Sequence, residues 1–218
     1  MAPLFRCQTP PPTVQSWLQP SSQKEGLGFP CMKLAGIFSL ASGGLEGYAA
    51  GTLHQHESIL FRSLWEGLEK GDLMLGERGF YSYAAMASLS LRGIDSVLRR
   101  HPARKVSFRE GERLGKDDRL RTWQKPAQRT DAWSLEEWEA LPAELSLRLI
   151  RLHVSTPGFR TQSVTLVTTL TDANSYPADK IRALYGQRWE VELQLKDPRK
   201  QTKPLFTFLA VAPKETKP

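Results

Sequence analysis

The 218-residue chain is poor in several features that would place it in specialised classes of protein. It has only two cysteines, too few for a disulfide framework, and no apolar run near the roughly 20 residues that a membrane-spanning helix needs. The first residues lack the apolar stretch of a signal peptide. No glycine-rich phosphate loop and no Ser-His-Asp arrangement stands out. With 40% hydrophobic and 24% charged residues, the sequence predicts a soluble, cytoplasmic, globular protein.

Positive charge is present in excess and is unevenly distributed. The formal net charge is +7, and residues 99–130 carry eleven Lys and Arg against four acids, so this stretch alone accounts for all of it. Such a concentration favours a polyanionic partner, and we take Arg104, Lys105 and Arg109 as DNA-binding candidates. The alternative is a solvated polar loop. Phe108 and Trp123 lie in the same stretch and are able to pack or stack.

The hydrophobic pattern predicts a mixed α/β domain. A stretch rich in Pro, Gln and Ser comes first, and Pro177 opens a long helix near the other end. The predicted divisions are an extended arm (1–30), a main domain (31–197) with a β-rich basic insertion (about 99–175), and a divergent basic tail (198–218). The predicted elements are a β-hairpin (32–50), helices (57–69, 82–91, 133–141 and 177–196) and strands (72–76, 94–98, 145–154 and 163–170).

Three segments carry a resemblance to a known family. They read QPSSQKEGLGFP at 19–30, GDLMLGERGFYSY at 71–83 and LYGQRWEVEL at 184–193. Together they resemble the bacterial insertion-sequence transposases of the insertion-sequence-four family, and the similarity extends over roughly residues 7–197. It implies a DDE enzyme of DNA transposition with an RNase H-like fold, in which a mixed sheet is flanked by helices and a β-rich insertion precedes the last catalytic helix.

The last predicted helix carries the most specific part of the resemblance. In the family, this helix has Tyr, two residues, Arg, three residues, Glu, six residues and Lys. Tyr185, Arg188 and Glu192 match that spacing, and Arg199 stands where the family has Lys. The resemblance implies that Tyr185, Arg188 and Arg199 contact DNA, and that Glu192 is a catalytic metal ligand. From the residues alone, Arg188 and Glu192 are an i,i+4 ion pair on a helix.

The carboxylates of the family site are only partly matched. The resemblance implies two Mg²⁺ ions, which clamp the attacking and leaving oxygens of the cleaved strand and are held by oxygen ligands. The second family Asp corresponds to Glu77, in the sequence GERGF. The first has no counterpart, since no acid precedes Glu25. We therefore expect Glu77 and Glu192 to be the catalytic and metal-binding pair. The alternative is that Glu77 pairs with Arg78 or another neighbour.

These departures predict a truncated or degenerate copy of a transposase whose Mg²⁺ site is broken. The resemblance implies double-stranded DNA as the partner, at the ends of a mobile element, and it admits a homodimer. Two functions stay open at this point. One is Mg²⁺-dependent strand cleavage and transfer, and the other is non-catalytic DNA binding by a domesticated or inhibitory fragment.

Overall fold

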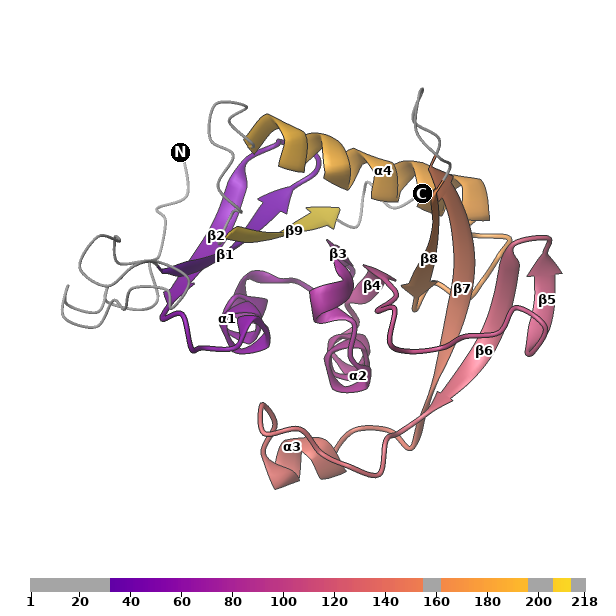
Figure 1. Ribbon diagram of the computed structural model, residues 1–218, viewed down its shortest axis with the longest axis horizontal. Helices are drawn as coiled ribbons and strands as arrows, with labels where there is room; N and C mark the ends of the chain where they lie inside the picture. The colour runs from indigo at the N-terminus through magenta and orange to yellow at the C-terminus, as the bar shows by residue number, and fades with distance from the viewer. Residues whose placement is uncertain (1–31, 155–161, 196–205, 213–218) are drawn as a thin grey trace.

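In the computed structural model, which describes residues 32–154, 162–195 and 206–212, nine strands form one mixed sheet. Four α-helices of this described part accompany the sheet (Figure 1). The strands are β1 (Lys33–Ser39), β2 (Leu45–Gly51), β3 (Leu73–Gly76), β4 (Asp95–Arg99), β5 (Glu112–Gly115), β6 (Asp118–Gln124), β7 (Glu144–Val154), β8 (Gln162–Thr168) and β9 (Phe206–Ala212). The helices are α1 (Glu57–Ser63), α2 (Tyr83–Leu91), α3 (Leu135–Glu139) and α4 (Ala178–Leu195), with 3-10 turns η2 (Trp65–Gly67) and η3 (Arg78–Phe80).

The order of the strands places the ends of β3 and β4 side by side. The sheet runs β2-β1-β9-β3-β4-β8-β7-β6-β5. β3 and β4 are parallel, with Leu73 opposite Asp95 and Gly76 opposite Leu98. Because parallel strands end at the same edge of a sheet, the residues that follow Gly76 and Leu98 share one edge in the middle of the molecule.

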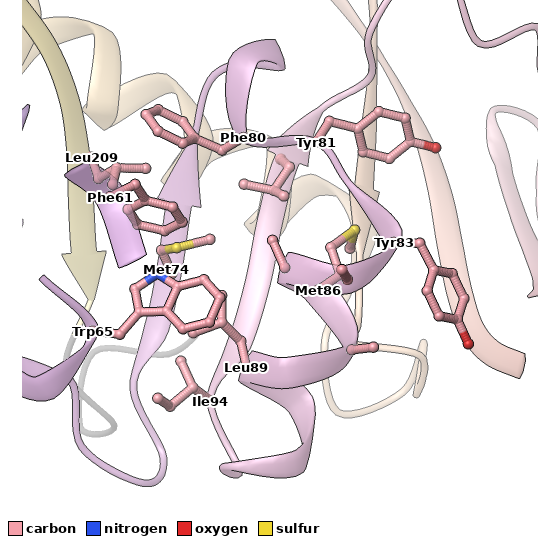
Figure 2. Close-up of a cluster of buried hydrophobic side chains, with 14 of the residues drawn as sticks. Phe61, Trp65, Met74, Phe80, Tyr81, Tyr83, Met86, Leu89, Ile94 and Leu209 are labelled. Atoms are coloured by element: carbon pink, nitrogen blue, oxygen red, sulfur yellow. The ribbon is translucent and has the colours of Figure 1, made fainter. Parts of the chain in front are cut away.

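Two hydrophobic cores lie on the two faces of this sheet. Figure 1 shows α4 across one face, with α1 and α2 on the other. Figure 2 shows the core on the side of α1 and α2, in which Phe61 and Trp65 lie close to Met74 of β3, and Met86 of α2 belongs to the same cluster. The core beneath α4 contains side chains that alternate with these along the same strands. Each central strand is therefore covered on both faces, which explains its nearly continuous apolar sequence.

The described part of the C-terminal segment is a central strand. The sequence separates residues 198–218 as a divergent tail, but β9 lies between β1 and β3, parallel to the first and antiparallel to the second. Leu209 and Val211 enter one core and Ala210 and Ala212 the other. The reason is the apolar run FTFLAVA, which suits a strand covered on both faces. The remaining domain boundaries stay predictions.

Most of the predicted elements are present near their predicted positions. The hairpin is β1–β2, joined by a turn in which Gly43 has φ of +67°. Ser82 caps α2 by accepting a hydrogen bond from the Ala85 amide at 3.2 Å, and a capping box of Ser134 and Glu137 opens α3. Mixed α/β architecture is therefore confirmed.

Two helices are shorter than predicted, since α3 covers only Leu135–Glu139 of the range 133–141 and α1 ends early. The sequence predicts helix over 57–69, whereas α1 ends at Ser63 and is followed by the 3-10 turn η2. Gly67 lies in that turn, and glycine weakens a helical interior by about 1 kcal/mol relative to alanine. Among the described residues, no helix is both long and apolar enough to cross a membrane.

Candidate functional site

Glu77 stands at the edge where β3 and β4 end. It is the N-cap of η3, and its Oε2 accepts a hydrogen bond from the Arg78 amide at 3.4 Å. The preceding Gly76 is packed so closely that a Cβ there would lie 2.7 Å from the Leu209 side chain and 2.9 Å from that of Leu98. This close packing against β9 and β4 sets the direction in which the chain leaves β3, and so positions Glu77.

Helix α4 brings Tyr185 and Arg188 to the same carboxylate. The Tyr185 hydroxyl donates to the Gly76 carbonyl at 3.2 Å and lies 3.5 Å from Glu77 Oε1. An Nη2 proton of Arg188 is donated to that same Oε1. Both α4 residues are fully buried, at 0% and 1% exposure. Two residues of the predicted helix motif are thus in direct contact with the residue in the second Asp position.

Burial has a marked effect on the Tyr185 hydroxyl. Desolvation raises the pKa of Tyr185 far above its ordinary value, and the Glu77 carboxylate adds to the rise, while the Arg188 guanidinium opposes it. The hydroxyl is consequently neutral at physiological pH and acts as a hydrogen-bond donor. It therefore ties α4 to the end of β3.

A second arginine faces Glu77 from β4. Arg99 Nη1 lies 3.6 Å from Glu77 Oε2, while Arg188 holds the other oxygen. Two guanidinium groups thus share one carboxylate, and these three side chains together carry a charge of +1. The Glu77 side chain is 25% exposed, so the cluster is open to solvent on one side.

The described residues do not fit a Mg²⁺ centre. Within them, no group of three or more His, Cys, Asp or Glu side chains comes together in a way that would hold a metal. Asp72 and Asp95 belong to the opposite ends of β3 and β4, where they accept hydrogen bonds from the Glu69 amide and the Thr169 hydroxyl, each at 2.8 Å. Since Mg²⁺ requires near-octahedral oxygen coordination, a single carboxylate already bound by two arginines does not provide it.

Two further predicted site residues, Glu192 and Arg199, lie near the end of α4 and after it. Glu192 lies on α4 one turn beyond Arg188, which is the same face of the helix, but its side chain lies outside the described residues. Arg199 also lies outside them. Metal binding by Glu192, DNA contact by Arg199 and the proximity of Glu77 to Glu192 therefore stay predictions.

Two of the three DNA-binding candidates in the insertion line a pocket. Arg104 and Lys105 lie beside Trp123 of β6 around a cavity of about 320 Å³. The Arg104 guanidinium lies 4.8 Å from the centre of the Trp123 ring. Arg109 is exposed and is not part of this lining. The pocket therefore presents cations next to an aromatic ring.

Another part of the basic stretch is built into the sheet as β5 and β6. The Arg119 guanidinium donates to the carbonyls of Phe108 and Asp118 at 2.7 and 2.8 Å, and the Lys125 ammonium donates to that of Leu141 at 3.0 Å. These hydrogen bonds connect separate segments of the insertion. The alternative of a solvated loop therefore does not describe β5 and β6, whereas residues 100–111 lie outside regular elements and are mostly exposed.

A buried ion pair connects the insertion to α4, and the sequence reasoning missed it. Arg148 of β7 binds both carboxylate oxygens of Asp118, with its Nε 2.8 Å from Oδ1. Its Nη1 also donates to the carbonyl of Tyr176, just before α4. The available signal was an arginine within the otherwise apolar segment 147–150. Arg99 was also missed, because it was counted only as part of the basic stretch.

The amino-acid sequence was compared with protein families, curated proteins and solved structures. Residues 5–199 match the family described as the transposase DDE domain. The chain is 31% identical over 173 residues to the transposase InsG for insertion sequence element IS4 from Escherichia coli strain K12. That alignment covers 78% of this chain and 36% of the relative, so the chain spans about a third of the relative's length. No solved structure matches it significantly. By the extent of the family match and the identity to this relative, the chain belongs to the transposase DDE domain family.

Proposed function

We propose that the chain binds double-stranded DNA at the ends of a mobile element, as a transposase-derived domain that does not cleave it. The carrying observation is the cluster at the end of β3, where Arg188 and Arg99 both engage Glu77. Arginine suits phosphate because its planar guanidinium makes paired hydrogen bonds. A site with net charge +1 and one accessible carboxylate attracts a DNA phosphate, whereas a divalent cation is repelled.

An RNase H-like fold is part of the same proposal. Its support is the antiparallel β1–β2 pair, the parallel β3–β4 pair, the helices on both faces of the sheet, and the insertion β5–β7 that precedes α4. In this arrangement the last helix crosses the ends of the central strands. It thereby delivers Tyr185 and Arg188 to Glu77, which is the placement that the DDE resemblance implies.

The insertion supplies the second part of the DNA surface in this proposal. Its exposed cations include Arg104, Lys105 and Arg109, and Arg148 ties the insertion to the start of α4. Backbone contacts of this kind release condensed counterions and carry little sequence information. We therefore expect weak sequence preference and strong salt dependence. Homodimer formation and a cytoplasmic location stay predictions.

The competing function is Mg²⁺-dependent strand cleavage and transfer, which the family name and the relative's name support. It requires that Glu77 leave its arginines and join Glu192 and further oxygen ligands around a metal. Enzymes of the DDE family use a divalent metal, so the two functions differ in one observable, which is nicking of DNA in the presence of Mg²⁺.

DNA binding is tested by fluorescence anisotropy with a labelled duplex over a range of salt concentrations. The logarithm of affinity is expected to fall with the logarithm of salt concentration, by about 0.9 per phosphate neutralised. Changing Lys105 and Arg109 together to Glu should flatten this slope. The matched control changes Lys70 and Lys180 to Glu, which removes two exposed cations outside the insertion. Equal slopes for both double variants would place the DNA surface elsewhere.

Cleavage is tested on a supercoiled plasmid that carries the ends of element IS4, with Mg²⁺ present. We expect no nicking by the chain, because Glu77 is bound by Arg188 and Arg99 and the described residues provide no second carboxylate beside it. Nicking that disappears in Glu192→Ala would overturn the non-cleaving function and establish the chain as an active transposase.

A further inference from the structure

Strand β9 lies in the middle of the described sheet and outside the part of the chain that matches the family. The sheet order places it between β1 and β3, whereas the family match covers residues 5–199 and β9 covers Phe206–Ala212. The other strands of the described sheet all fall within the matched residues. A segment beyond the family match therefore completes the centre of the sheet.

The strands on either side of β9 depend on it for part of their backbone pairing. β1 pairs with β2 and β9, and β3 pairs with β4 and β9, so among the described strands β1 and β3 are joined only through β9. Without β9, each would present one unpaired edge, and the two edges would face each other across a strand slot roughly 10 Å wide. Unpaired strand edges are templates for pairing with a further segment. The strand slot between β1 and β3 is therefore a site for an extended segment.

The strand slot fixes the direction and register of the segment that fills it. β9 runs parallel to β1, with Ser39 opposite Val211. It runs antiparallel to β3, with Leu75 opposite Ala210. Just after β1, the Leu40 amide also donates to the Val211 carbonyl at 2.8 Å. Main-chain hydrogen bonds of this kind hold an added strand, and alternate side chains select its sequence.

The strand slot also selects side chains by size. Leu209 and Val211 enter the core on the side of α1 and α2. Ala210 and Ala212 enter the core beneath α4, and none of these four residues is more than 6% exposed. The Leu209 side chain packs so closely on Gly76 that a Cβ there would lie 2.7 Å away. The slot therefore requires larger aliphatic residues on one face and alanine-sized residues on the other, because overfilling a close-packed core is destabilising.

We propose that the strand slot binds residues 206–212 of a second copy of this chain as well as those of its own chain. A second copy offers the same segment, so an exchanged strand forms the same hydrogen bonds and the same packing as β9. Residues 196–205, which join α4 to β9, span at most roughly 35 Å when extended, which is enough to reach a neighbouring copy. Exchange of an identical element is a low-cost route to a dimer. The inference goes beyond the proposed DNA binding and does not rest on it.

Exchange is tested with two cysteine variants of the full chain, whose cysteines meet only when β9 of one copy lies in the strand slot of the other. Met74 of β3 and Val211 of β9 are Cα partners whose side chains enter the same core. Opposite residues of antiparallel strands are close enough for a disulfide. One variant carries Met74→Cys and the other Val211→Cys, and both carry Cys7→Ser and Cys31→Ser.

The two variants are mixed, unfolded in urea, refolded together at high concentration and oxidised, and the linked heterodimer is identified by mass spectrometry. The matched control pairs Val211→Cys with Leu91→Cys, at the end of α2, where the leucine is 62% exposed. We expect at least about 5-fold more heterodimer from the Met74→Cys pair, because only an exchanged β9 brings its two cysteines together. Equal yields from the two pairs would overturn the proposal.

A single chain with both changes shows whether the cysteine pair closes within one copy. Met74→Cys combined with Val211→Cys should form an internal disulfide in the monomer, because β3 and β9 are adjacent in one chain. Internal closure without any heterodimer in the mixture would show that the strand slot accepts only its own chain, which contradicts the proposal. Failure of internal closure would contradict the register of β9 against β3, and the proposal would fall with it.

The selectivity of the strand slot is tested with the synthetic peptide PLFTFLAVAPK, which has the sequence of residues 204–214. The full chain carries Ala210→Asp, which places a carboxylate in the apolar core beneath α4 and disfavours insertion of its own strand. The peptide should raise the midpoint of thermal unfolding of this variant by at least about 3 °C, as measured by circular dichroism, and the same peptide with Ala210→Asp should not. Equal effects of the two peptides, or no effect of either, would refute binding of a separate strand.

Discussion

The chain buries two arginines to the same extent and surrounds them differently. Arg148 and Arg188 are each 1% exposed, and each donates to a carboxylate. The partner of Arg148 is Asp118, which is 7% exposed and bound through both oxygens, with the Tyr176 carbonyl as a further acceptor. The partner of Arg188 is Glu77, which is 25% exposed and shared with Arg99.

The difference separates a structural ion pair from an accessible one. A buried pair is costly to desolvate, and it is maintained when hydrogen bonds satisfy all of its groups, as around Arg148. Glu77 and Arg99 remain in contact with solvent, at 25% and 32% side-chain exposure, whereas the Arg188 side chain is 2% exposed. The pair in the insertion therefore holds the insertion against α4, while the pair at the end of β3 is the one to which the proposed function assigns a DNA phosphate.

The largest effect on stability should come from breaking the buried ion pair of Arg148 and Asp118. Arg148→Met leaves the Asp118 carboxylate buried without its partner, which we expect to lower the free energy of unfolding by about 3–5 kcal/mol. Urea denaturation followed by circular dichroism measures it. The double variant Arg148→Met with Asp118→Leu should recover most of the loss, since apolar replacement of a whole pair is close to neutral. A single-variant loss below about 1 kcal/mol would contradict a structural role.

Breaking the contacts of Glu77 with Arg188 and Arg99 should lower the stability less. Glu77→Gln removes the carboxylate from Arg188 and Arg99, and we expect a loss of about 1–3 kcal/mol in the free energy of unfolding, typical of a charge-assisted hydrogen bond. Duplex DNA should bind more tightly to this variant, because the charge of the cluster rises from +1 to +2. Unfolding and anisotropy titrations give the two quantities. Weaker DNA binding in a stably folded variant would contradict the phosphate role of these arginines.

The Tyr185 hydroxyl should add a smaller, pH-dependent contribution. Tyr185→Phe loses its hydrogen bonds to Gly76 and Glu77, at a cost of about 1 kcal/mol at pH 7. Because the folded-state pKa of Tyr185 is raised above 10.0, its contribution is fully present below pH 10 and is lost as the pH rises further. Between pH 8 and 11, the free energy of unfolding should therefore fall more steeply with rising pH in the parent chain than in Tyr185→Phe. Parallel curves would show that this hydroxyl is not buried.

The smallest effect should come from an ion pair on the same helix whose carboxylate is exposed. Asp179 pairs with Arg182 on α4 at 2.6 Å, but its side chain is 92% exposed. Asp179→Asn should change the free energy of unfolding by no more than about 0.5 kcal/mol, and it should leave DNA affinity near that of the parent. It is the control for Glu77→Gln, and an equal loss in both would remove the distinction between the two pairs.

Local patterns predicted most of the secondary structure. The capping box at Ser134, the cap at Ser82 and the turn at Gly43 are signals contained within a few residues, and they accompany elements that the sequence predicts. The family resemblance assigned Glu77, Tyr185 and Arg188 to one site, but it gave Glu77 a metal ion and not Arg188 as its partner. Residues more than 100 positions apart come into contact because of the order of the strands in the sheet, and the hydrophobic periodicity of the sequence does not predict such contacts.

Two features were out of reach of the same reasoning. β9 was taken for part of a tail, because an apolar run of seven residues does not reveal which strands it will lie between. The pairing of Arg148 with Asp118 depends on the register of β6 against β7, where Asp118 stands opposite Ile150. A shift of one residue would turn Arg148 to the other face, so strand propensity alone could not locate its partner.

The sequence by itself determined where helices and strands form, which family the chain resembles and where its positive charge is concentrated, because these depend on neighbouring residues or on composition. The tertiary structure decided that Glu77 is bound by two arginines, that the C-terminal run completes the centre of the sheet, and that Trp123 and Arg104 share a pocket. Each of these depends on strand order and on burial. The physical reason is that the charge state and partners of a side chain are set by the groups packed around it, and folding brings those groups from distant parts of the chain.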